Sequence, residues 1–243
     1  MRSFSGPLFS SNGPRVGDVK QGSLGDCYFL AGLGAIAIDS PNVIRQRIVD
    51  FNDGTYGVRL GNSFYRVDND LPVSSLTSSV PAYAKLGVGN SMWVAIAEKA
   101  FAFYRRNAAS YASIEGGWSV EVNRAFGSTR ASESGFTAFG SATALGNAIS
   151  NYWNSFEAVT VGFSADAKKT ASNTSPLILG HMYTVAGLVR NASGIITGIK
   201  LRNPWGTDGG AVRTDNIDDG FITVTLQQLW DVRSIGRVNW GRV

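Results

Sequence analysis

The sequence has one cysteine, one histidine and few charged residues, and these shortages narrow what the chain can be. Because Cys27 is the only cysteine among 243 residues, no intramolecular disulfide can form. A chain of this length buries roughly 70–75% of its unfolded surface, so it can fold on its core alone. Charged residues make up 16% of the chain, and the net charge of +4 comes without a dense run of Lys and Arg. A nucleic-acid surface needs such clusters, so we expect no nucleic-acid partner.

Long apolar segments are also missing. The longest run, from Cys27 to Ile38, has 12 residues, whereas a membrane span needs about 20. Residues 1–20 lack the apolar core of a signal peptide. We therefore expect no membrane association and, by default, a cytoplasmic location. The composition leaves open whether the chain is a whole protein or one domain of a longer one.

Two kinds of pattern follow each other along the chain. Apolar residues at helical spacing dominate the first half, and alternating, β-branched segments between Gly, Asn and Ser turns dominate the second. Helices are expected at 27–38, 93–106 and 141–153, strands at 55–60, 63–67, 157–164, 181–190, 195–203 and 220–226, and a polar loop at 164–177. The sequence thus predicts an α+β fold with a mainly helical subdomain (1–140), a β-rich subdomain (141–243) and a cleft between them.

His181 and Asn203 flank one predicted hairpin. If residues 191–194 form its turn, position 190 pairs with 195, and His181 lies one residue out of register with Asn203. A wide turn or a bulge would bring the two side chains together. An amide oxygen can hold an imidazole in one tautomer, which is what a general base needs.

Cys27 opens the apolar run, after Asp26. A lone cysteine among apolar residues is most often an inert core residue, and a lone histidine is most often structural. The competing interpretation is a nucleophile at a helix start, where the helix dipole favours the thiolate and a nearby imidazole takes its proton. Asp26 is then expected to be the N-cap residue.

The segments "QGSLGDCYFLA", "GHMYTVAG" and "LRNPWG" resemble the Cys, His and Asn motifs of calpain-type cysteine proteases, and the resemblance runs from about residue 13 to residue 230. It implies a papain-like fold and a cysteine endopeptidase that hydrolyses protein or peptide substrates through a thioester acyl-enzyme. The roles it implies are nucleophile for Cys27, general base for His181, orienting residue for Asn203, oxyanion donor for Gln21, cover of the His–Asn bond for Trp205, and substrate binding for Gly180 and Gly127.

The family's calcium sites are only half present. Asp18 stands where one loop would supply a ligand, but Ala112 takes the place of its glutamate. Asp219 stands in the second loop, where a further glutamate is missing after Gly220. Calcium takes six to eight oxygen ligands, so we expect weak binding or none, with calcium at most an activator. The chemistry itself requires no cofactor.

Two other functions compete with the peptidase. One is an acyl transfer on the same scaffold, such as transglutamination or deamidation, although those enzymes usually orient the histidine with Asp. The other is a catalytically silent domain that binds a partner. The joint presence of Gln21, Cys27, His181 and Asn203 argues against silence, because a binding domain does not need all four.

Overall fold

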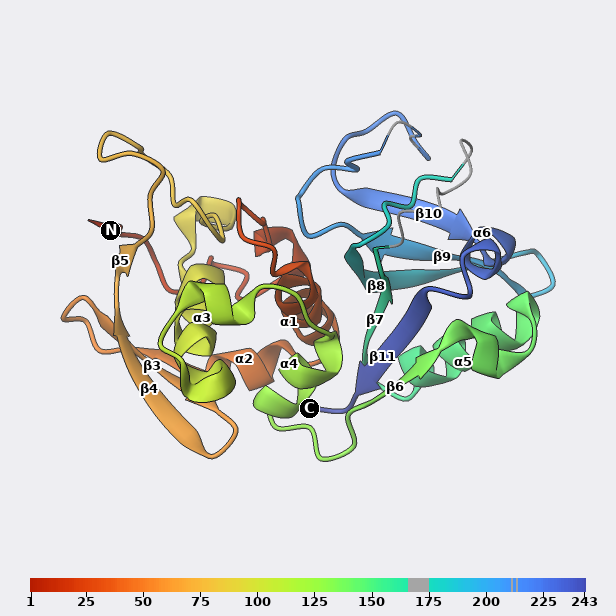
Figure 1. The fold of residues 1–243 in the computed structure, drawn as a ribbon, viewed down its shortest axis with the longest axis horizontal. Coiled ribbons are helices and arrows are strands. Elements are labelled where there is room, and N and C mark those ends of the chain that lie inside the picture. The colour runs from red at the N-terminus through yellow and green to blue at the C-terminus, as the bar shows by residue number, and fades with distance from the viewer. Residues whose placement is uncertain (166–174, 211, 213) are drawn as a thin grey trace.

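Two hydrophobic cores organise the chain, and Figure 1 shows the two parts side by side. The structure is a computed structural model that describes residues 1–165, 175–210, 212 and 214–243. One core is built from residues 4–126 together with Ala158 and Met182, and the other from residues 136–238. The change of core lies near the predicted boundary at residue 140, and the division into subdomains stays a prediction. The mixture of helices and antiparallel sheets confirms the α+β class.

The first part of the chain is not purely helical, since a small antiparallel sheet of order β2-β3-β4 packs beside its helices. Its elements are β1 (Arg2–Ser3), η1 (Val16–Asp18), α1 (Cys27–Asp39), α2 (Pro41–Arg47), β2 (Ile48–Asp50), β3 (Thr55–Leu60), β4 (Ser63–Asp68), β5 (Asp70–Leu71), η2 (Val88–Asn90), α3 (Trp93–Tyr104), η3 (Arg105–Asn107), η4 (Tyr111–Ile114) and α4 (Ser119–Ala125). The predicted hairpin is confirmed as β3 and β4.

Helix α1 is the central helix, buried on all sides as its apolar sequence predicts. Two glycines allow its neighbours to approach. A Cβ on Gly32 would lie 2.8 Å from a side-chain atom of Val122 in α4, and a Cβ on Gly34 would lie 2.6 Å from Oγ1 of Thr184 in strand β8 (Met182–Arg190). The Thr184 hydroxyl donates to the backbone oxygen of Ala31 at 2.7 Å. The helix that begins at Cys27 is therefore fixed against both parts of the fold.

The second part is a twisted antiparallel sheet with helices beside it (Figure 1). Within the described residues the strand order is β10-β9-β8-β7-β11-β6. Its elements are β6 (Ser132–Gly135), η5 (Phe136–Phe139), α5 (Ala142–Asn154), β7 (Ala158–Phe163), β8 (Met182–Arg190), β9 (Ile196–Arg202), β10 (Phe221–Thr225), α6 (Leu226–Asp231) and β11 (Gly236–Gly241).

Some predicted elements need correction. The helix expected at 93–106 ends at Tyr104, because Arg105 turns inward and Arg106 has a φ of 57°. Most of the polar loop expected at 164–177 lies outside the described residues. Among the described residues, no single helix is long and apolar enough to cross a membrane. The pair α1 and α2, bent by 112°, passes that test on length and composition alone.

Candidate active site

A cleft of about 310 Å³ lies where the start of α1 faces the ends of β7 and β8. One wall comes from the first part of the chain and the other from the sheet. The lining residues are Gly25, Cys27, Gly116, Gly117, Trp118, Phe163, Ser164, Ala165, Gly180, His181 and Met182. Three residues expected in the site, Cys27, Gly180 and His181, are thus brought together.

Cys27 is the first residue of α1, half-buried, with a free thiol. The first N–H groups of a helix have no partner within it, so the Cys27 N–H is available to a ligand. Burial raises the pKa of the Cys27 thiol to about 11, although a backbone hydrogen bond from Met182 acts in the opposite direction. The resting site therefore holds a neutral thiol, because desolvation is the largest effect on the Cys27 pKa, and the contribution of the helix dipole stays a prediction.

His181 is 5% exposed and lies directly before β8, and its Nε2 is 2.8 Å from Oδ1 of the fully buried Asn203. The Asn203 amide is oriented by its other contacts: Nδ2 donates to the Asp208 backbone oxygen, and Oδ1 also accepts from the Trp205 N–H. An amide oxygen only accepts, so His181 donates from Nε2 and keeps Nδ1 as the basic nitrogen. Burial lowers the pKa of His181 to about 4, although the bond to Asn203 raises it.

The register that brings the pair together differs from the predicted one. The β8–β9 ladder pairs Thr184 with Arg202 and contains irregularities at Val185/Gly187 and Val189/Arg190. His181 and Asn203 therefore lie just beyond the ladder and are not cross-strand partners. The Asn203 N–H instead donates to the Gly220 oxygen at 2.8 Å. The contact itself agrees with the sequence prediction, while the direct opposition of the two residues does not.

Trp205 lies against the imidazole. The two ring centroids are 4.6 Å apart, at an interplanar angle of 46°. Trp205 keeps 40% of its surface exposed, so it separates His181 from solvent on that side. Gly209 permits this packing, because its φ is +74° and a Cβ there would lie 2.5 Å from the Trp205 ring.

Two other predicted residues lie outside this group. Among the described residues that line the cleft, neither Gln21 nor Gly127 is found. Gln21 Nε2 donates to the Leu24 oxygen at 2.7 Å, and its backbone N–H donates to the Pro204 oxygen. Gly127 follows α4, where an added Cβ would lie 2.0 Å from the guanidinium of Arg47. The roles of Gln21 and Gly127 stay predictions.

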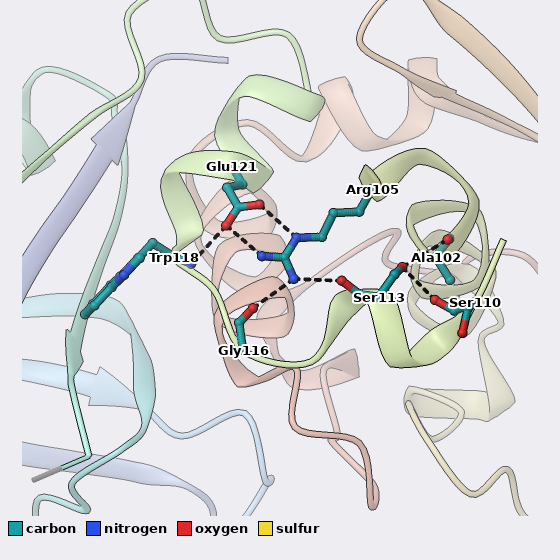
Figure 2. A network of polar contacts seen from close by, with 7 residues as sticks. All are labelled: Ala102, Arg105, Ser110, Ser113, Gly116, Trp118 and Glu121. Atoms are coloured by element: carbon teal, nitrogen blue, oxygen red, sulfur yellow. Dashed lines mark hydrogen bonds and ion pairs between the residues drawn. The ribbon is translucent and has the colours of Figure 1, made fainter. Parts of the chain in front are cut away.

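Sequence reasoning missed the cleft wall at residues 116–118 and the buried arginine behind it, shown in Figure 2. The guanidinium of Arg105 donates to both carboxylate oxygens of Glu121 (2.9 and 3.0 Å), to the Gly116 oxygen (2.8 Å) and to the Ser113 oxygen (3.0 Å). Glu121 also accepts from the Trp118 N–H at 3.4 Å. In the sequence, the Gly116-Gly117 dipeptide directly before a helix was the one feature that could have indicated this wall.

The two candidate calcium ligands, Asp18 and Asp219, are poorly arranged to bind a cation. Asp18 is fully buried, and its oxygens accept from the N–H groups of Val88 and Arg15 and from Nε1 of Trp93. Asp219 is exposed and accepts from the Phe221 N–H. Among the described residues, no group of three His, Cys, Asp or Glu side chains could hold a metal ion. The residues present at Asp18 do not fit calcium in this arrangement, and calcium activation stays a prediction.

The helix that starts at Cys27, packed against an antiparallel sheet that carries His181 and Asn203, defines a papain-like α+β protease fold. A sequence model of the calpain family cysteine proteases matches residues 2–211. The chain therefore belongs to the calpain family of cysteine proteases.

Curated relatives agree with this assignment. The calpain-1 catalytic subunit of Bos taurus is 28% identical over 228 residues, covering 84% of this chain and 29% of the relative. The calpain-2 catalytic subunit of Gallus gallus is 25% identical over 220 residues (82% and 29%), and calpain-9 of Homo sapiens is 27% identical over 218 residues (82% and 30%). The chain thus spans less than a third of the length of these relatives.

Proposed function

We propose that the chain is a cysteine endopeptidase that cleaves peptide bonds of protein substrates with Cys27, His181 and Asn203. The observation that carries the proposal is the 2.8 Å contact between His181 Nε2 and Asn203 Oδ1. It lies beside the cleft that both His181 and Cys27 line. It leaves Nδ1 of the imidazole free to take the thiol proton. Trp205, packed against His181 at a tilt of 46°, keeps water from this pair.

In the proposed reaction, Nδ1 of His181 takes the proton from Sγ of Cys27, and the thiolate attacks the substrate carbonyl carbon. The Cys27 N–H stabilises the oxyanion, and we assign the second hydrogen of Gln21 Nε2 to the same task. The imidazolium then protonates the leaving amine as the C–N bond breaks, which leaves a thioester. Water, deprotonated by His181, hydrolyses the thioester and restores the thiol.

A catalytically silent binding domain is the alternative that one observation favours. The described residues show no hydrogen bond between the Cys27 sulfur and the His181 ring, and burial keeps both groups in their neutral forms. Catalytic contacts are often loose without substrate and tighten when it binds, so this geometry is compatible with a peptidase. A thiol-reactive peptide probe separates the two functions, because only a working site labels Cys27 faster than a free thiol.

The peptidase is tested with a peptide library and the variant Cys27→Ala. Loss of a catalytic nucleophile costs on the order of 10⁶ in turnover, so cleavage by Cys27→Ala should fall to background while its thermal unfolding stays cooperative. Wild-type cleavage sites give the specificity. Ordinary cleavage by the folded alanine variant would exclude Cys27 as the nucleophile.

A further inference from the structure

The side chain of Asp26, the residue before Cys27, does not cap the helix that it precedes. Asp26 is fully buried, and its carboxyl group makes no capping hydrogen bond to α1. Asp26 is thus the N-cap residue of α1, as the sequence predicts, but its side chain does not form the capping bond. The backbone oxygen of Asp26 still accepts from the N–H groups of Phe29 and Leu30, at 2.8 and 3.2 Å. The carboxyl group instead lies beside that of Glu98 in α3, and both carboxyl groups are buried.

This contact requires a proton. Two buried carboxyl groups in contact repel each other if both are ionised, and ionised carboxylates only accept hydrogen bonds, so one of the two carries a hydrogen. Glu98 is 2% exposed and its two oxygens accept from the Ala84 N–H at 3.0 and 3.2 Å. Within the described residues, no N–H or O–H group donates to either buried oxygen of Asp26. Burial raises the pKa of Asp26 to about 7 and also raises the pKa of Glu98. The proton belongs to the pair and not to either residue alone.

The surroundings do not neutralise a second negative charge. Facing groups come from several elements: Cys27 and Tyr28 in α1, Tyr111 in η4, Glu115 after it, and Lys85 before α3. Glu115 adds negative charge. Lys85 is the cation that acts on Glu98, and its Nζ already donates to the Pro81 oxygen at 2.5 Å. Arg105 lies behind the Tyr28 ring, where it binds Glu121.

We propose that Asp26 and Glu98, sharing one proton, form a positioning pair that fixes the start of α1 against α3 and thereby sets the position of Cys27 in the cleft. This inference rests on the proposed peptidase function. Removal of the shared proton would leave two buried negative charges in contact, which repel each other. The repulsion would displace the residue next to Cys27, and the added charge would oppose the Cys27 thiolate. The working form is the singly protonated pair, so activity should fall at alkaline pH.

The test compares pH profiles of wild type, Asp26→Asn and Glu98→Gln. An amide N–H replaces the shared proton in each variant and does not titrate. Wild-type kcat/KM should fall about tenfold per pH unit above the pKa of the pair, as for any single essential proton, and both variants should lose this limb. Glu115→Gln, which removes a neighbouring charge but no hydrogen bond of the pair, should keep it. A purely structural role would change stability at every pH without moving the limb.

Two measurements do not depend on peptidase activity. One is the pH dependence of the free energy of unfolding, which should fall from pH 5 to pH 8 more steeply in wild type than in either variant. The other is alkylation of Cys27 by iodoacetamide, where the ratio of variant to wild-type rate should rise above pH 7. Shifts in both profiles without any peptide cleavage would support the pair and refute the peptidase. Profiles identical to wild type would overturn the pair, whatever the peptidase activity.

If neither variant folds, an infrared titration of the carboxylic acid band tests whether the pair shares a proton. Burial also raises the pKa values of Glu157 and Asp208, so the protein used is Glu157→Gln with Asp208→Asn. A carboxylic acid band that persists above pH 6 in this protein supports the shared proton. Absence of the band overturns it.

Discussion

Burial acts in opposite directions on the two reactive side chains of the cleft. It raises the pKa of the Cys27 thiol to about 11 and lowers the pKa of His181 to about 4, so the resting pair is neutral. An ion pair can form only if each charge stabilises the other at short range, because neither is stable alone in this site. A substrate that closes the cleft and excludes water would strengthen that attraction.

Protonation of His181 should destabilise the fold in acid. Between pH 6.5 and about pH 4 the unfolded chain binds a proton at this histidine and the folded chain does not, so the free energy of unfolding decreases as the pH falls. The expected loss is about 3 kcal/mol, at roughly 1.4 kcal/mol per pH unit. Urea unfolding at pH 7 and pH 4 measures it, and His181→Gln should lose less stability than wild type over this range. The Asp26–Glu98 pair is present in both proteins and cancels from the difference. Equal losses would contradict the neutral, buried histidine.

Asn203→Ala should reduce turnover more than substrate affinity. It removes the acceptor of His181 Nε2 and leaves the Trp205 N–H and the Asp208 oxygen without their partner. A lost buried partner costs about 1–3 kcal/mol, which corresponds to a decrease of roughly 5- to 150-fold in kcat. Steady-state kinetics against Asn154→Ala, an exposed position in α5, provides the comparison. A fall in kcat no larger than that of the control would remove Asn203 from the site.

Residue contacts were predictable where they are local. His181 and Asn203 flank one hairpin, so spacing alone indicated that they meet. The role of Asp26 was not predictable, because its partner Glu98 lies in another helix and the contact arises only when α1 packs on α3. The raised pKa of Cys27 was missed for the same reason, since burial is a property of the fold and not of the helix start.

At the scale of elements, strong local patterns were sufficient and weak ones were not. For helix α1 and for strands β3 and β4, the ends predicted from the sequence pattern agree with the observed ends within one residue. The strands β6 and β11 were missed, because segments that end in Gly and lack clear alternation become strands only through their neighbours. β11 lies between β7 and β6, and its pairing with β7 completes the sheet behind the cleft.

The cleft wall at residues 116–118 depends on Arg105, which directly follows α3 and begins η3. Arg105→Lys keeps the charge but cannot bridge Glu121 and the Gly116 oxygen with one planar fork. We expect a loss of about 1–3 kcal/mol in stability and an increase of several-fold in KM for peptides, because the wall loses its hydrogen bonds. Kinetics and urea unfolding of Arg105→Lys and of the exposed control Arg106→Lys measure both. An unchanged KM in the folded variant would show that the wall does not contact substrate.

At the scale of the whole molecule, the site exists because two cores meet along α1. Met182 and Ala158 of the sheet belong to the core of the first part, and Thr184 bonds to α1, so the two walls of the cleft are packed against each other. The composition and patterns predicted two such parts. They did not predict how closely the parts join, since these contacts connect residues far apart in the sequence.

Calcium should raise peptidase activity only a few-fold. A ligand shifts a conformational equilibrium by its differential affinity for the two states, and few carboxylates mean weak binding. Asp18 already accepts three hydrogen bonds from the protein, and Ala112 supplies no carboxylate. Chelator-treated protein is titrated with calcium while peptide cleavage and thermal unfolding are followed.

The variant Asp18→Asn distinguishes a structural role of Asp18 from a role as a calcium ligand. A single amide oxygen cannot accept all three donors, so the variant should lose about 1–3 kcal/mol of stability equally with and without calcium. If Asp18 binds calcium, the loss should be larger with calcium present, because the ion stabilises only the protein that binds it. An enzyme that is inactive in chelator and rises steeply at micromolar calcium would show that the cation, and not packing along α1, assembles the cleft.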